Sequence, residues 1–144
     1  MARLQAGTAL AARVMLAIVF IVEAWAKLTD YAGTLQYMES YGVPAALLPP
    51  AILVELFGGL LVLGGLLSRA AALALFAFCL VTALVFHTAF GDPDQIIHFT
   101  KNVAMAGGFL LLAAHGPGEW SVDARLAQDS WDGSKAAPPA ERRT

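Results

Sequence analysis

The chain has 144 residues and a formal net charge of −2; 58% of its residues are hydrophobic and 14% are charged. Soluble domains carry about 25% charged residues, so this composition favours an integral membrane protein with a single domain. No basic patch suggests a nucleic-acid partner, and the lipid bilayer is the first partner we expect. Cys79 is the only cysteine, which excludes an intrachain disulfide and a dithiol couple within this chain.

Four apolar segments are each long enough to cross a hydrocarbon core of about 30 Å as a helix. They cover residues 10–28, 49–67, 70–90 and 96–115. The fold class we expect is all-α, a four-helix transmembrane bundle with a short interfacial segment between the first two helices. Residues 1–118 would form this membrane domain, and residues 119–144 a polar C-terminal tail that is cytoplasmic and partly disordered.

The connectors carry their own signals. Residues 34–41 predict a short interfacial helix, because tyrosines suit the membrane–water interface, and the Gly42-Val43-Pro44 sequence would end it. Residues 121–131 predict a short surface helix, and residues 133–144 are expected to be disordered.

The first apolar segment also has features of a cleaved signal peptide. Arg3 and Arg13 would form the basic region, and Ala24-Trp25-Ala26 resembles a cleavage motif. The bulky Trp25 and the polar pattern that continues to Lys27 favour a retained first helix.

Four crossings place both termini on the same side of the membrane. Seven of the nine basic residues fall on that side, namely Arg3, Arg13, Arg69, Arg125, Lys135, Arg142 and Arg143. Only Lys27 and Lys101 fall toward the other side. The positive-inside rule therefore places the termini and the Arg69 turn in the cytoplasm of a multi-pass protein.

A few polar side chains interrupt the apolar segments near their non-cytoplasmic ends. They are Glu23, Lys27, Glu55, His87, Lys101 and Asn102. At 1.5 Å per residue, five of these six side chains lie about 5 to 9 Å below those ends. The sixth, Lys27, is nearer the surface. A carboxylate in hydrocarbon is costly, so Glu55 needs a partner or a wet cavity. The two acids and two lysines sum to zero, which would give each charge an opposite partner.

This polar layer has three interpretations. One is a structural ion-pair network that fixes the helix packing. Another is an outward-facing pocket for a carbonyl-bearing ligand such as a quinone, in which His87 or Lys101 donates a hydrogen bond and Glu23 or Glu55 carries a proton. The third is a metal site of Glu23, Glu55, His87 and His98; these ligand types fit, but no close-spaced ligand motif supports it, so no metal is predicted.

Several sequence elements occur in an order and spacing that resemble the DoxX family of small four-helix membrane proteins. They are Glu23-Ala24-Trp25-Ala26-Lys27-Leu28, Tyr41-Gly42-Val43-Pro44, Glu55-Leu56-Phe57-Gly58-Gly59, the run from Gly64 to Ala72, His87, and the runs from Lys101 to Gly108 and from Gly116 to Asp123. The resemblance covers about residues 12–123. It implies a bacterial inner-membrane protein and a link to quinol oxidase or thiosulfate:quinone oxidoreduction, with redox-enzyme subunits as partners.

The leading functional hypothesis is therefore a redox-associated accessory subunit whose polar cluster binds a quinone-type molecule or a partner protein. The redox part rests on the family resemblance, because the chain has no self-sufficient catalytic motif. The alternatives are a structural or assembly module and a small solute or proton transporter. Four spans leave little room for an alternating-access repeat, so a transporter would need a homo-oligomer, which the sequence leaves open.

Overall fold

The computed structural model describes the backbone of residues 1–136 and the side chains of residues 1–131. Its helices are α1 (Ala2–Thr29), α2 (Tyr31–Ser40), the short 3-10 helix η1 (Ala45–Leu47), α3 (Leu48–Gly64), α4 (Ser68–Phe86), α5 (Pro93–His115) and α6 (Val122–Ala136). Four of them, α1, α3 continued from η1, α4 and α5, are long and apolar enough to cross a membrane. The predicted all-α four-helix bundle is confirmed.

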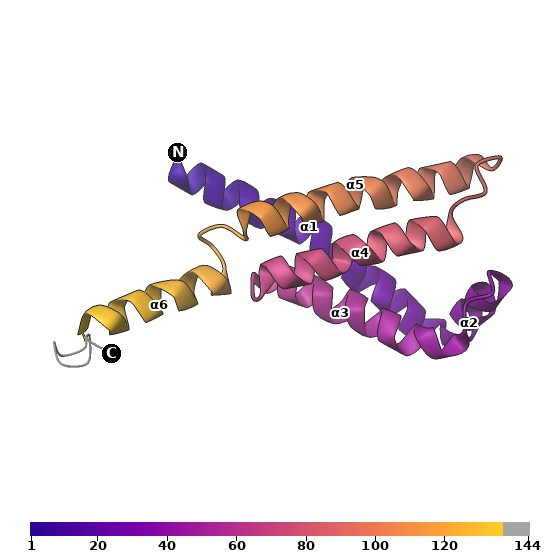
Figure 1. Ribbon diagram of the computed structural model, residues 1–144, viewed down its shortest axis with the longest axis horizontal. Coiled ribbons are helices and arrows are strands. Elements are labelled where there is room, and N and C mark those ends of the chain that lie inside the picture. Colours follow the sequence, from indigo (N-terminus) through magenta and orange to yellow (C-terminus); the bar gives the residue numbers. More distant parts are fainter. Residues whose placement is uncertain (137–144) are drawn as a thin grey trace.

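The four long helices form two pairs. Helix α1 packs along α3, helix α4 packs along α5, and α3 contacts α4 to join the pairs. Figure 1 shows the N-terminus and α6 at one end of the bundle, here called the terminal end, and α2 with the α4–α5 connection at the other, here called the α2 end. The two pairs are close at the α3–α4 turn and diverge toward the α2 end (Figure 1).

Small residues allow this close packing near the middle of the bundle. A Cβ added to Gly58 would lie 2.9 Å from Leu75 Cδ2, and one added to Gly59 would lie 3.0 Å from Ile21 Cγ1. Small residues let apolar helices approach in a bilayer, where hydrophobic burial between helices provides little driving force. Phe20 and Phe109, with ring centroids 5.2 Å apart, meet edge to face in the same core.

The helix ends differ from the expected ranges for local reasons. Helix α3 ends at Gly64 rather than at residue 67, because Gly65 takes a left-handed conformation with φ 70°. The Gly65 and Leu66 amides then bond back to the carbonyls of Val62 and Leu61, the pattern that closes many helices. Helix α5 begins at Pro93 rather than at residue 96, because Asp92 accepts a hydrogen bond from the Asp94 amide as its N-cap.

Helix α4 ends at Phe86, four residues before the expected end at residue 90. His87 is therefore not inside the third helix as predicted, but is the first residue of the link to α5, with φ −125° and ψ 36°. Near the C-terminus, helix α6 covers residues 122–136, so residues 133–136, expected to be disordered, continue the helix. Residues 137–144, also expected to be disordered, lie outside the described residues.

Candidate functional site

A pocket of about 620 Å³ lies between the two helix pairs at the α2 end. Its volume is within the range of small-molecule sites. All six side chains predicted as site residues line it, namely Glu23, Lys27, Glu55, His87, Lys101 and Asn102. Apolar side chains from the middle of the bundle also line it, including Val19, Phe20, Phe78 and Met105, and α2 with η1 contribute further lining residues.

One wall of the pocket carries an ion-pair triad that joins α1 to α3. Lys27 Nζ lies 3.0 Å from Glu55 Oε1 and 3.3 Å from Glu23 Oε2. The Glu55 side chain is 5% exposed, whereas that of Glu23 is 51% exposed. Glu55 Oε2 is buried and has no hydrogen-bond partner within the described part of the chain. With two acids and one cation, this wall has a formal charge of −1.

Lys101 lines the pocket from α5, in the other helix pair. It is exposed, and among residues 1–131 it forms no ion pair. The expectation that every charge has an opposite partner is therefore wrong for Lys101, because Lys27 already contacts both acids on the α1–α3 side. The pocket thus has an acidic wall on the α1–α3 side and one basic side chain, Lys101, from the other helix pair.

Two histidines stack at the α2 end. The rings of His87 and His98 have centroids 5.0 Å apart and planes inclined by 22°. His87 Nδ1 lies 2.9 Å from Gln95 Oε1, a partner that the sequence reading missed. Glu23 and Glu55 pair with Lys27 instead, and the described side chains contain no group of three or more potential metal ligands. The four side chains considered as a metal site are therefore not gathered into one cluster.

Asn102 is engaged by the protein itself. It is buried, and its Nδ2 donates to the carbonyl of His98 at 3.0 Å. Its Oδ1 accepts from Thr82 Oγ1 of α4 at 3.3 Å. The first bond lies within α5 and the second ties α5 to α4, so Asn102 holds the pocket wall in place more than it offers a free polar group.

An aromatic cluster connects α2 to the end of α4, and the sequence did not reveal it. Phe86 stacks on Tyr37 with ring centroids 5.6 Å apart and meets Tyr41 edge to face at 5.3 Å. Both Tyr37 and Phe86 line the pocket. Burial, together with a hydrogen bond and the charge of Tyr41, raises the pKa of Tyr37 to about 12. The spacing of the two tyrosines by four residues could have placed them on one face, but not against Phe86.

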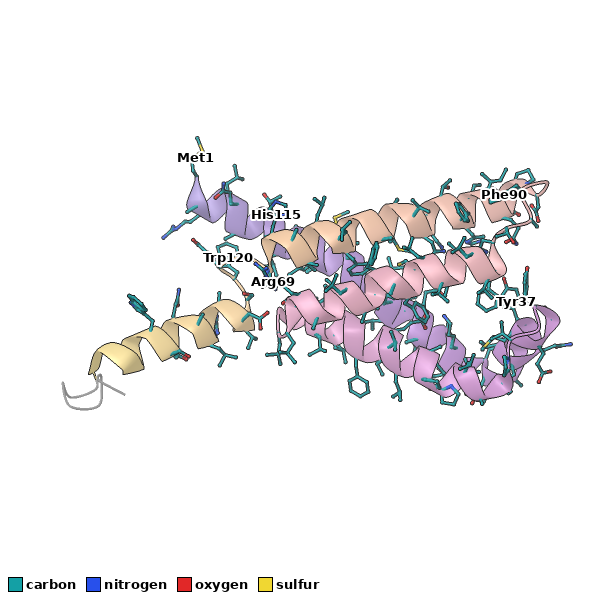
Figure 2. All side chains as sticks on the ribbon, viewed as in Figure 1. Met1, Tyr37, Arg69, Phe90, His115 and Trp120 are labelled. Carbon is teal, nitrogen blue, oxygen red and sulfur yellow. The ribbon has the colours of Figure 1, made fainter. Side chains whose placement is uncertain are left out.

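A second polar junction, also missed, closes the terminal end. Arg13 is 2% exposed and donates to the carbonyls of Leu63, Pro117 and Trp120 at 2.8 to 3.0 Å. The Asp123 carboxylate accepts from the amides of Leu67 and Ser68 at 2.8 and 2.9 Å. Figure 2 places Trp120 and Arg69 near each other at this end and Tyr37 at the opposite one. An arginine inside an apolar run was the available signal, but the sequence predicted for Arg13 only a topology-setting charge or part of a signal-peptide basic region.

Comparison with known proteins bears on this arrangement. A family model described as DoxX matches residues 8–88, a range that contains Glu23, Lys27, Glu55 and His87. The inner membrane protein YqjF of Escherichia coli (strain K12) is 48% identical over 122 residues, covering 85% of this chain and 93% of that protein. The inner membrane protein YphA of the same organism is 37% identical over 123 residues, covering 81% and 88%.

A third relative, named "Putative oxidoreductase CatD", comes from Bacillus subtilis (strain 168) and is 36% identical over 73 residues, or 51% of this chain and 54% of that protein. No solved structure matches the chain. The family match, the two inner-membrane relatives and the four membrane-length helices agree with one another. The chain belongs to the DoxX family of inner-membrane proteins.

Proposed function

We propose that this protein is a redox-associated accessory subunit of a bacterial inner membrane, and that its pocket binds a quinone-type molecule. Both termini would lie in the cytoplasm, because Arg3, Arg13, Arg69 and Arg125 are all near the terminal end. The pocket at the α2 end would then open toward the periplasmic side.

The single observation that carries the proposal is Glu55. Its carboxylate is 5% exposed in an apolar helix, contacts Lys27, and lines a pocket of about 620 Å³. A buried ion pair that served packing alone would not need a cavity of ligand size beside it. Ionisable side chains within membrane segments commonly mark substrate or proton pathways. Lys101 of the facing helix forms no ion pair with the residues that the structure describes, so it adds a donor for a ring oxygen.

The accessory role follows from what this chain can supply. It has one cysteine, Cys79, which is fully buried, and therefore no dithiol couple of its own. A bound quinone would exchange electrons with a partner enzyme, and one relative carries an oxidoreductase name. The pocket would hold and orient the quinone ring for that partner.

The test is quinone binding by the full-length protein in lipid nanodiscs. We expect Glu55→Gln and Lys101→Met each to weaken binding of a short-tailed ubiquinone analogue about tenfold, equivalent to ~1.4 kcal/mol. Glu39→Gln, on α2 and outside the pocket, should bind as the wild type does. If the wild type does not bind, or neither pocket variant differs from it, the proposal is wrong.

The same variants separate the two alternatives. The Lys27–Glu55 contact joins α1 to α3, so a structural module predicts lower folded yield for Glu55→Gln with no quinone binding by any form. A transporter predicts solute or proton flux in proteoliposomes that depends on these side chains. Flux equal to that of empty vesicles would exclude the transporter.

A further inference from the structure

The acidic wall of the pocket offers a hydrogen-bond acceptor and no free donor. Lys27 Nζ lies 3.0 Å from Glu55 Oε1, within ion-pair distance, and the carboxylate of an ion pair can only accept hydrogen bonds. Glu55 Oε2 is buried without a partner among the described residues. An unpaired buried carboxylate oxygen is costly, so a ligand group that donates to it would be favoured. The last torsion of a glutamate is soft, so the carboxylate can turn this oxygen toward a bound group.

The facing helix offers the opposite chemistry. Lys101 of α5 lines the pocket with an ammonium group, which carries three donors and no acceptor. It forms no ion pair with the described residues, so its donors are free for a ligand. A ligand that spans the pocket therefore meets an acceptor on one side and a donor on the other.

Quinones and quinols differ in how they fit this pair. A quinone oxygen is a carbonyl and only accepts, so it satisfies Lys101 but sets its lone pairs against those of Glu55. A quinol oxygen carries a hydroxyl, which both donates and accepts. One quinol hydroxyl can donate to Glu55 while the other accepts from Lys101.

We infer that this pocket selects the reduced, hydroxyl-bearing quinol over the oxidised quinone, with Glu55 as the acceptor that distinguishes them. The inference rests on the proposed quinone-type ligand and adds the redox state that the site prefers. Hydrogen bonds to charged groups are stronger than those between neutral groups, so the preference should be large enough to measure.

The experiment measures the equilibrium binding of duroquinol and of duroquinone to the full-length protein in nanodiscs. The duroquinol measurement is made under anaerobic conditions. We expect the wild type to bind duroquinol at least about tenfold more tightly than duroquinone. In Glu55→Gln the affinities for duroquinol and duroquinone should lie within about twofold of each other. The amide can accept from a quinol hydroxyl and can also donate to a quinone carbonyl. Lys101→Met should weaken both forms and keep the preference for the quinol, and Glu39→Gln should change neither affinity.

Each outcome bears on a different claim. Binding of both forms with equal affinity, or tighter binding of duroquinone, overturns the redox selectivity and leaves the proposed ligand class standing. Binding of neither form by the wild type removes the proposed function and this inference together. If Glu55→Gln does not fold, the wild-type ratio and Lys101→Met still decide the matter.

Discussion

Lys27 Nζ lies 3.0 Å from Glu55 Oε1, which links α1 to α3 beside the pocket with a side-chain contact that is largely shielded from solvent. The same ammonium contacts Glu23 at 3.3 Å. Lys27 therefore shares its charge between a buried acid and a half-exposed one. The buried acid depends on it far more, since the side chain of Glu23 is 51% exposed to solvent and that of Glu55 only 5%.

The first prediction concerns stability. Lys27→Met should leave Glu55 buried without its cation and lower the free energy of unfolding by about 3 kcal/mol, the usual cost of breaking a buried pair from one side. The measurement is the denaturant or thermal midpoint of the detergent-solubilised protein. Lys101→Met is the matched control, because Lys101 makes no ion pair among residues 1–131. Adding Glu55→Leu to Lys27→Met should restore part of the loss; a further drop would contradict this account.

The second prediction concerns the terminal end. Arg13→Leu would leave three carbonyl groups, those of Leu63, Pro117 and Trp120, without their donor. Hydrogen bonds to charged groups contribute about 1.5 to 3 kcal/mol each, and these three are part-buried, so we expect a stability loss of ~3 kcal/mol, seen as a lower unfolding midpoint. Arg13→Lys should recover only part of it, since a lysine lacks the planar fork. Arg3→Leu, an exposed site near the same end, should have little effect.

The third prediction is a pH dependence at Asp123. Burial acts to raise the pKa of this carboxyl, but hydrogen bonds from Ser68 and Leu67 and the charge of Arg13 outweigh it, so the pKa lies below the ordinary 3.8. A lowered folded-state pKa means that ionised Asp123 adds stability above about pH 4, and that this contribution is lost as the pH falls through the folded-state pKa.

Asp123→Asn should therefore be less stable than the wild type at pH 6, and the difference should shrink as the pH falls below 3.8. The measurement is the unfolding midpoint of both proteins across this range. Asp129→Asn, at an exposed position of the same helix, is the control. A difference that stays constant with pH would show that Asp123 acts without its charge.

The fourth prediction concerns the aromatic cluster of Tyr37, Tyr41 and Phe86. Phe86→Ala should release α2 from the end of α4, because it removes both ring contacts that join them. Aromatic pairs contribute about 0.5 to 1.5 kcal/mol each beyond burial, so amide exchange in α2 should become roughly tenfold faster. Phe90→Ala removes a different pair, with Phe99, and should leave α2 exchange unchanged. Equal exchange in both variants would mean that the cluster does not hold α2.

Much of this protein could be read from its residues alone. In a bilayer every backbone amide must be paired within its own segment, so four long apolar runs predict four helices whatever their packing. The rise of a helix is constant, so counting residues predicts a common depth for Glu23, Glu55 and Lys101. All six predicted site residues do line one pocket.

What only the tertiary structure could decide is which of these groups meet. Side-chain contacts depend on how helices distant in sequence are paired and rotated, and no local pattern encodes that. Because α1 packs on α3, Lys27 reaches both acids; because α5 packs on α4, Lys101 remains on the opposite wall. The same cause explains why the sequence did not predict the contacts of Phe86 and Arg13. Their partners lie in helices or loops far along the chain, and only folding brings them together.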